Sequence, residues 1–564
     1  MKTLLKNGTV VNVFTGELER ADILLENNKI IGVGDYGDAD ADVVEDIGGK
    51  YVCPGFIDGH IHIESTMLTP AELAKLCLVR GTTAIVTDPH EIANVCGVAG
   101  ISYMLEASRG LPMHVYVNLP SCVPATPFDE SGAQLYADDL KPLYADPRVI
   151  GLAEMMNYPG VIAKDPAVMA KIQDALADGR VVDGHAPFLS GKALDAYVSA
   201  GIQSDHECAD IEEAKEKLRK GQWIMIRQGT AARNLPDLLP LFDPPYCHRC
   251  VLVTDDRHPA DLAGEGHIDN AIRLAGQLGK SVITAIQMAT IQAAQCFGLH
   301  YVGAVAPGYR ADIVVLDDLN NVTVRDVYAN GNKVVSQGVL MPFDTPAVSA
   351  ELDALVRHSF HTEPLSTDHF HIEEKGSVCR VIQVIPSQLL TDEVHLEINW
   401  QENNGVDTIR DIIKLAVIER HKNTGHMGLG FISGLGLKKG AIASSVSHDS
   451  HNLIVIGTNN EDMALAANHI CKVGGLVVVA DGHIVADMPL PIAGLMADRS
   501  GTEIAKANEV VREAVHTLGV NEGIEPFMNM AFVSLPVIPS LKMSTQGLVD
   551  VNKWQRVSLY VTEA

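Results

Sequence analysis

Tyr51-Val-Cys-Pro-Gly-Phe-Ile-Asp-Gly-His-Ile-His62 is the stretch that decides the fold of this 564-residue chain. It is an apolar strand, interrupted by Pro-Gly and closed by two histidines. Residues two apart on a strand point to the same face, so His60 and His62 can reach one metal ion. Histidine is the commonest nitrogen ligand for such ions. Because the chain has 22 histidines, the pair indicates a metal site only if further ligands lie beside it.

Residues 54–302 repeat one pattern, in which an apolar run ends in polar residues and a helical segment follows. The predicted strands are 52–57, 82–86, 114–118, 149–153, 180–183, 201–204, 223–226 and 250–254. Helices are predicted between them, among others at 70–80, 166–178 and 210–220. Strands alternating with helices in this number and over this length are typical of a (β/α)8 barrel. The predicted fold class is therefore α/β, with a TIM-like barrel at 54–302.

Short β-rich runs flank the barrel, at 9–13, 21–25 and 29–33 and again at 311–316, 322–328 and 333–335. We predict that 1–53 and 303–345 form one discontinuous, β-sandwich-like domain into which the barrel is inserted. A linker at 351–374 then leads to strands at 380–385, 393–398 and 453–456 and a helix at 461–472. We predict that 346–564 form a C-terminal α/β domain that closes on the active site. Its glycine-rich stretch lacks the spacing of a P-loop.

The composition limits the classes of partner. A net charge of −28 and a pI of about 5.1 argue against nucleic acid or an anionic membrane as a partner. We see no signal peptide and no membrane span, and we read the ten dispersed cysteines as reduced thiols of a cytoplasmic protein. Cys247-His-Arg-Cys250 lacks the second ligand pair that a structural zinc site needs. We also expect a homo-oligomer, a dimer.

Polar residues gather where the predicted strands end, which is where barrel enzymes carry their chemistry. They are His60 and His62, Asp88 with His90 and Glu91, Asn118, Glu154 with Asn157 and Tyr158, Asp183 with His185, Asp205 with His206 and Glu207, Arg227 with Gln228, and Asp255 to His258. One such residue is unremarkable, because Asp caps helices and loop histidines are common. Their shared location at one end of the barrel predicts a metal site.

A carboxylate has two oxygens and can bridge two metal ions. His60, His62 and Asp255 could hold one ion, His185 and His206 a second, and Glu154 could bridge them. Such ions lower the pKa of a bound water toward neutrality, and a nearby carboxylate must then carry the proton. Asp255, Glu91 and Glu207 are the candidates, in falling order of preference. Oxygen and nitrogen ligands without thiolate suit Mn, Fe or Zn.

Several longer motifs resemble one family. The Pro54–His62 run, the barrel pattern and the β-rich return at 304–316 look like the metal-dependent amidohydrolase superfamily. More narrowly, the chain resembles the bacterial adenine deaminases. The resemblance lies in His60-Ile-His-Ile-Glu-Ser-Thr-Met67, Thr87-Asp-Pro-His-Glu-Ile-Ala-Asn-Val95, Val253-Thr-Asp-Asp-Arg-His-Pro259 with Glu265-Gly-His-Ile-Asp269, and Ser445-Val-Ser-His-Asp-Ser-His-Asn452. It covers essentially the whole chain.

The resemblance implies hydrolytic deamination of adenine to hypoxanthine and ammonia, by attack of metal-bound hydroxide on ring carbon C6. It implies two divalent ions, Mn or Fe, with Zn as a further possibility. Many amidohydrolases bridge their metals with a carboxylated lysine, whereas Glu154 stands at that strand end here, as in adenine deaminases. We assign substrate binding to Asn157, Tyr158, His90, His448 and Asp449, the last two brought to the barrel mouth by the C-terminal domain.

Three other functions fit part of the sequence. Another amidohydrolase, opening a cyclic amide or deaminating a different base, would have the same fold, but Glu154 argues against it. A non-catalytic relative would be expected to lack some of the strand-end ligands, and here every expected strand end is filled. A cytidine-type zinc deaminase needs Pro-Cys-x-x-Cys. Tyr246 interrupts that motif in Pro245-Tyr-Cys247-His-Arg-Cys250.

Overall fold

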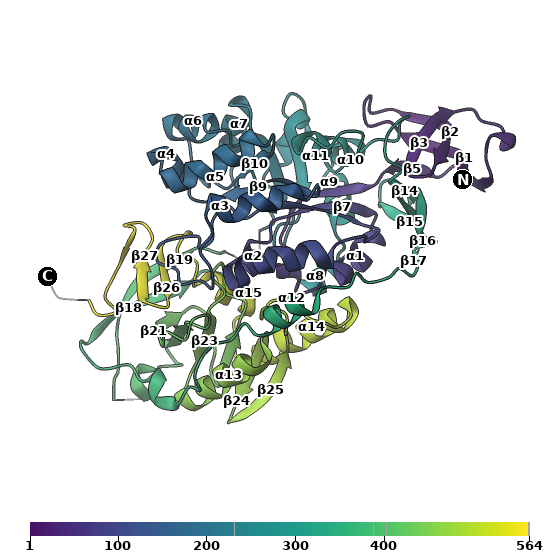
Figure 1. Cartoon of the computed structure of the whole chain (residues 1–564). Helices are drawn as coiled ribbons and strands as arrows, with labels where there is room; N and C mark the ends of the chain where they lie inside the picture. Colours follow the sequence, from purple (N-terminus) through teal and green to yellow (C-terminus); the bar gives the residue numbers. More distant parts are fainter. Residues whose placement is uncertain (231, 387, 402, 562–564) are drawn as a thin grey trace.

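The computed structural model describes residues 1–561 except 231, 387 and 402. A parallel barrel lies in the upper half of the view in Figure 1. Its strands are β6 (Phe56–Ile61), β7 (Thr82–Thr87), β8 (His114–Leu119), β9 (Val149–Met155), β10 (Val181–Gly184), β11 (Ser204–Asp205), β12 (Trp223–Arg227) and β13 (Cys250–Val253). They form two parallel arcs, β6 to β10 and β11 to β13. Gln203 N donates to Val182 O at 3.0 Å and Asp255 N to His60 O at 2.9 Å, which joins the arcs on both sides. The predicted α/β barrel is confirmed.

Helices between the strands have local start and stop signals. Asp210 caps α7, because its carboxylate accepts from the amides of Glu212 and Glu213, and Lys217 and Arg219 lie in the last turn. The helices of this region are α1 (Pro70–Leu78), α2 (His90–Ala107), α3 (Ala137–Leu140), α4 (Tyr158–Ala163), α5 (Pro166–Ala177), α6 (Gly191–Ser199), α7 (Ile211–Arg219), α8 (Pro259–Gly264), α9 (Ile268–Gln277), α10 (Val282–Met288) and α11 (Ile291–Cys296).

The opening run of the sequence differs from its prediction as a single strand at 52–57. It forms β5 (Tyr51–Pro54), which belongs to a different sheet, and β6, which begins the barrel. The chain changes sheets at Gly55, where a Cβ would lie 2.1 Å from Thr83 Oγ1. Glycine is therefore needed for this close approach. The predicted strand at 201–204 is also shorter and shifted, to β11.

Strands that precede the barrel in the sequence share one sheet with strands that follow it. The order is β17-β16-β15-β14-β5-β1-β2-β3, with β4 beside β1. The sequence predicts a sandwich-like domain, and these strands form a single mixed sheet. The division of the chain into three domains remains a proposal. The strands are β1 (Lys2–Val11), β2 (Leu18–Glu26), β3 (Lys29–Gly34), β4 (Val43–Asp46), β14 (Ile313–Asp318), β15 (Thr323–Ala329), β16 (Asn332–Ser336) and β17 (Val339–Leu340).

The C-terminal part lies along one side of the barrel, below it in the view of Figure 1. Its main sheet has the order β19-β18-β21-β20-β23-β22-β24-β25. These strands are β18 (Val378–Val384), β19 (Thr391–Glu397), β20 (Ile413–Ile418), β21 (Met427–Ser433), β22 (Ala441–Ser444), β23 (Leu453–Gly457), β24 (Leu476–Ala480) and β25 (His483–Met488). A small sheet follows, of β26 (Leu541–Ser544), β27 (Gly547–Asp550) and β28 (Gln555–Arg556).

Helices connect this part to the barrel. The segment predicted as a linker begins with helix α12 (Ala350–Arg357), which packs against α2. α14 (Gly501–Thr517) packs against α8, and α13 (Asn460–Val473) covers β22, β23 and β24. The remaining helix is α15 (Pro526–Phe532). None of the helices in the described part of the chain has both the length and the apolar character needed to cross a bilayer.

Two lysines of the C-terminal part are almost wholly buried. The Nζ of Lys542, on β26, donates to Leu389 O at 3.0 Å, and burial lowers its pKa to about 7. Lys414, on β20, is lowered to a pKa of about 8 by burial. Its Nζ donates to three oxygens, Phe370 O at 2.8 Å and the side-chain carbonyls of Asn404 and Asn460, both at 2.6 Å.

We expect Lys542→Met to raise the melting temperature, because methionine fills the space without the cost of burying an amine. The folded-state pKa of Lys542 lies below the usual 10.5, at about 7. The buried lysine therefore lowers the free energy of unfolding. This penalty is greatest below about pH 7 and shrinks to zero as the pH rises toward about 10.5. A shift of this size corresponds to on the order of 5 kcal/mol. Thermal unfolding of both proteins at about pH 6 and about pH 10 measures the difference.

Lys414→Met is the matched control. It removes a buried lysine that makes three hydrogen bonds and takes their donor from Phe370 O and the side-chain carbonyl of Asn460, while Asn404 still accepts from Ile372 N, so the melting temperature should fall. A gain in the Lys542 variant that stays constant with rising pH would contradict the assignment of the penalty to protonation.

Candidate active site

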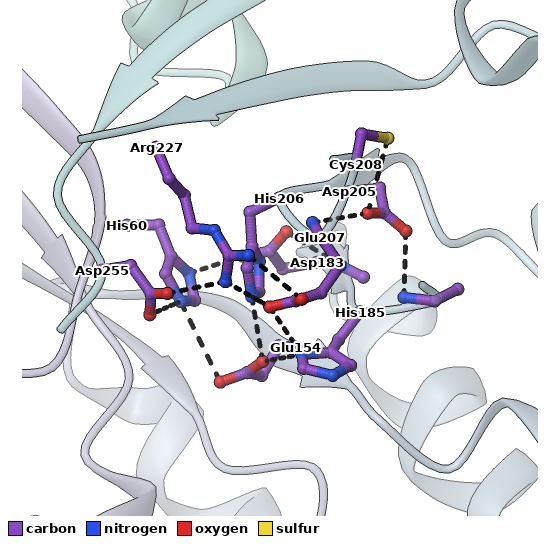
Figure 2. Close-up of polar contacts among 12 residues, drawn as sticks. His60, Glu154, Asp183, His185, Asp205, His206, Glu207, Cys208, Arg227 and Asp255 are labelled. Carbon is purple, nitrogen blue, oxygen red and sulfur yellow. Dashed lines mark hydrogen bonds and ion pairs between the residues drawn. The ribbon is translucent and has the colours of Figure 1, made fainter. Parts of the chain in front are cut away.

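The side chains that follow the barrel strands converge at one end of the barrel (Figure 2). His60 lies near the end of β6 and His62 directly follows it, while His185 follows β10 and His206 follows β11. Glu154 lies on β9 and points into the group from the opposite side. All are buried except His185, which is partly exposed. The barrel thus brings together all six residues that the sequence proposed as metal ligands, Asp255 included.

Glu154 lies at the centre, and its two oxygens face different histidines. Oε1 is 3.3 Å from His62 Nε2 and 3.9 Å from His60 Nε2. Oε2 is 2.7 Å from His185 Nδ1 and 3.2 Å from His206 Nε2. The carboxylate therefore stands between two pairs of imidazoles. This is the arrangement that a bridging ligand requires.

Hydrogen bonds from the Nδ1 atoms hold the rings of His60 and His62 in place. His60 Nδ1 lies 3.1 Å from Asp183 Oδ2, and His62 Nδ1 lies 3.1 Å from the carbonyl oxygen of Asp88. With Nδ1 as the donor in both rings, both Nε2 atoms carry lone pairs. These two atoms are 3.2 Å apart, and Asp255 Oδ1 is 3.2 Å from His62 Nε2. Lone pairs at this separation repel unless a cation lies between them, so the donors fit a metal ion.

The pKa shifts of the clustered side chains also indicate a cation site. Burial opposes protonation of His62, but Asp255 and Glu154 outweigh it and raise the His62 pKa well above its usual value. Against burial, Glu154 likewise raises the pKa of His206. The pKa of Glu154 is held well below its usual range, since the surrounding histidines outweigh the cost of its burial. The cluster therefore stabilises positive charge at its centre, as a cation site must.

Among the described residues, the groups of donors close enough to hold an ion include His60, His62 and Asp255; His60, Glu154 and His206; and His185, His206 and Glu207. A further group joins His62 and Glu154 to Asp88 and His90. The donors are imidazoles and carboxylates without thiolate, which suits Mn, Fe or Zn. The residues present therefore fit the divalent metals that the sequence predicted.

A cavity opens beside this cluster, and both parts of the chain line it. The barrel contributes the metal-ligand candidates His62, Glu154, His185, His206 and Asp255 together with His90, Met156, Glu207, Arg227, Ala232 and Asp256. The C-terminal part contributes Leu389, His448, Asp449, Phe532, Leu535 and Ile538. His90 Nε2 lies 3.7 Å from Asp449 Oδ1, which connects the two sides. One wall is polar and the other largely apolar.

The three candidate proton carriers lie in different surroundings. Asp255 Oδ2 accepts from Arg227 at 2.9 Å, which leaves Oδ1 facing the histidines. Glu207 also pairs with Arg227, and against the effect of burial this guanidinium holds the Glu207 pKa far below its usual range. Glu207 is thus kept ionised. Against the effect of burial, His62 and Arg227 likewise hold the Asp255 pKa well below its usual range, so ionisation does not distinguish the two carboxylates, and the geometry favours Asp255, whose Oδ1 faces the histidines.

Glu91 lies behind the cavity wall rather than on it. Ser65 Oγ is 2.5 Å from Glu91 Oε1 and 2.6 Å from Asp256 Oδ1. Burial, together with the nearby charges of Glu64 and Asp256, raises the Glu91 pKa well above its usual value. Its Oε1 also lies 3.8 Å from His448 Nδ1, and its Oε2 lies 3.8 Å from His451 Nε2. Glu91 therefore reaches the cavity indirectly, through Ser65, Asp256 and His448.

Two residues proposed for substrate binding lie elsewhere. Asn157 caps α4, since its Oδ1 accepts from Gly160 N at 2.9 Å, and Tyr158 begins that helix. Neither is among the described residues that line the cavity, where Met156 takes the place expected for them. A polar residue just after a strand also starts the next helix, and the sequence pattern does not separate these two roles.

Other lining residues were missed. Leu389, Phe532, Leu535 and Ile538 come from the C-terminal part and have no motif that ties them to a site. Arg227 was noted at its strand end but given no role. Its position beside two acidic strand ends, Glu207 and Asp255, was the signal that could have identified it as their partner.

The chain is similar to known proteins over almost all of its length. Residues 51–334 match the amidohydrolase family, and residues 388–555 match the adenine deaminase C-terminal domain. Adenine deaminase 2 of Carboxydothermus hydrogenoformans is 47% identical over 98% of this chain and 96% of that protein. An adenine deaminase of Nitratidesulfovibrio vulgaris is 45% identical, over 97% and 94%. One of Clostridium acetobutylicum is 44% identical, over 97% and 96%.

Glu154→Gln should lower the amount of metal that copurifies with the chain, because an amide cannot bridge two cations as a carboxylate does. We expect a loss in affinity at least as large as the roughly 10–100-fold that follows loss of a partner outside the ligand sphere. Elemental analysis of desalted protein measures it. His469→Gln removes a histidine that pairs with Asp487 at 2.9 Å in the C-terminal part and should leave the metal content unchanged. Equal metal in all three proteins would contradict the site.

Proposed function

The chain belongs to the adenine deaminase family of the amidohydrolase superfamily, and from this premise we propose that it hydrolyses adenine to hypoxanthine and ammonia in the cavity beside Glu154. It is a hydrolase that acts on a carbon–nitrogen bond. The observation that carries the proposal is the position of Glu154, whose two oxygens stand between two pairs of imidazoles on the polar wall of a cavity. The opposite, apolar wall suits a flat purine ring.

We propose that His60, His62 and Asp255 hold one divalent ion, that His185 and His206 hold a second, and that Glu154 bridges them. When bound, such ions act as Lewis acids and bring the pKa of water near neutrality. Mn or Fe are the metals we favour. Asp183 and the carbonyl of Asp88 keep the rings of His60 and His62 in the required orientation.

The apolar wall would bind the faces of the ring. Phe532, Leu535 and Ile538 present this surface, and Met156 faces them from the barrel. Closing water out of the cavity strengthens each polar contact inside it. His90, His448 and Asp449 remain as the polar groups available to the edge of the purine.

Asp255 is the residue we propose as proton carrier, at Oδ1. Arg227 holds the other oxygen, so Oδ1 is the atom left to face the reacting groups. Hydrolysis requires one proton to leave water and one to reach the exocyclic nitrogen before ammonia departs. Asp256, half-buried on the same wall and next in the sequence, is the alternative carrier.

We further propose that the chain works as a homodimer in the cytoplasm, without nucleic acid or membrane as a partner. All ten cysteines are free thiols, which supports a reducing compartment. The acidic net charge of −28 supports the absence of a polyanionic partner.

Metal-replete protein should release ammonia from adenine faster than from other purines, pyrimidines or cyclic amides. The assay is ammonia release, with ring opening followed for the cyclic amides. Removal of metal by a chelator should abolish turnover, and adding Mn or Fe should restore it. Absence of adenine turnover in metal-replete protein would refute the proposal, and faster opening of a cyclic amide would favour the alternative amidohydrolase activity.

Asp255→Asn and Asp256→Asn should separate the two neighbouring carboxylates. Loss of the proton carrier lowers kcat by about 10²–10⁴-fold, and we expect this loss for the Asp255 variant. Because Asp255 also lies beside His62, metal content is measured in the same samples. A larger loss of kcat in the Asp256 variant, with metal retained in both, would move the role to Asp256.

A further inference from the structure

Residues 120–136, which follow β8, pack against α2. We call this segment the platform. Gly132 N donates to Asn94 O at 2.7 Å, and Leu135 N donates to Val123 O at 3.0 Å. A Cβ at Gly132 would lie 2.1 Å from the backbone oxygen of Val95, so the segment approaches the helix as closely as glycine permits. The platform is therefore fixed to the helix that begins with His90.

One residue of this platform, Glu130, contacts three separate segments of the C-terminal part. Its backbone oxygen accepts from Asn452 Nδ2 at 2.7 Å. Its Oε2 accepts from Thr545 Oγ1 at 2.5 Å, and its Oε1 lies 2.8 Å from His426 Nδ1. Two residues earlier, the ring of Phe128 meets Trp554 edge-on, with centroids 5.2 Å apart. These contacts tie the platform to segments far apart in the sequence.

Asn452 belongs to the loop that carries His448 and Asp449 into the cavity. Other side chains hold this loop from the C-terminal side. His421 Nε2 lies 2.8 Å from Ser450 O, and the buried Arg420 donates from Nε to His451 O. The loop is thus fixed on its own side by Arg420 and His421, and on the barrel side by Glu130.

We propose that Glu130 is a positioning residue, which holds the loop 445–452 against the barrel so that His448 and Asp449 stand at the cavity. The proposal rests on the proposed function, because the loop matters only if the cavity binds the substrate. Glu130 acts through the loop, since it is not among the residues that line the cavity. None of its three contacts involves a residue that we propose as a metal ligand.

Two hydrogen bonds carry this role. Thr545 fixes the Glu130 side chain, and this keeps the backbone oxygen of Glu130 in place to accept from Asn452 of the loop. The side chain of His426 is 54% exposed, so its ion pair with Glu130 is screened by solvent and contributes little. Thr545 and Asn452 are almost completely buried, and hydrogen bonds to them exclude water. Gln keeps an oxygen that can accept from Thr545. We therefore expect Glu130→Gln to behave nearly as the natural chain and Glu130→Ala to be impaired.

The test compares Glu130→Ala, Glu130→Gln and Thr545→Val. For the alanine variant we expect kcat/KM for adenine to fall about tenfold or more, metal content to stay unchanged, and amides of 445–452 to exchange hydrogen faster. Glutamine should restore most of the loss, and the valine variant should show part of it. The matched control is Glu393→Ala. Glu393 pairs with His395 at 2.7 Å within β19 and with Arg380 at 3.0 Å on β18, so the substitution should change none of the three readouts.

The outcomes separate the two proposals. If the natural chain does not turn over adenine, the proposed function fails, while hydrogen exchange still tests the contact of Glu130 with the loop. If the natural chain is active and Glu130→Ala matches Glu393→Ala in both kcat/KM and exchange, the positioning role is overturned. Should Glu130→Ala fail to fold, Thr545→Val decides, because it removes only a hydroxyl. Full activity and natural exchange rates in that variant would also overturn the role.

Discussion

The structure depends on one buried carboxylate. Glu154 is 3% exposed, and imidazoles from β6, β10 and β11 surround it. A carboxylate this deep is costly unless positive charge meets both of its oxygens. A closed barrel can supply that charge from several directions at once, because the ends of its strands face a common centre. An open sheet could bring histidines to Glu154 from only one side.

The backbone hydrogen bonds that close the barrel therefore also bring the residues of the site together. The amide of Asp255 bonds to the carbonyl of His60, so the backbone contact that joins the last strand to the first also sets two ligand candidates side by side. Asp58 reinforces this contact by accepting from the amide of Thr254 at 3.1 Å. The C-terminal part then adds the apolar wall, which the strand ends of the barrel do not provide.

The barrel, and the meeting of its strand-end residues at one end, could be predicted from the sequence because each strand end is a local pattern. His60, Glu154 and His206 are each recognisable from a few neighbouring residues, and the fold brings them together by rule. The apolar wall could not be predicted, since Phe532 and Leu389 reach the cavity only through the packing of distant segments. Local pattern also failed where one residue type serves two purposes. Asn157 follows a strand, as a binding residue would, yet it caps a helix. Pro54 and Gly55 sit inside an apolar run, yet they divide it between two sheets.

The order of these residues along the chain also sets an order in time. Asp255 completes the proposed metal ligands, and Thr545, the last of the contacts to Glu130, follows it by about 290 residues. At ribosomal rates of roughly 5–20 residues per second, the proposed ligands leave the ribosome about 15–60 s before Thr545, which fixes the Glu130 side chain. During that interval the proposed metal ligands are not yet covered by the whole of the C-terminal part. The division of the site between two parts of the chain thus gives the nascent protein a period in which ions can enter before the wall closes.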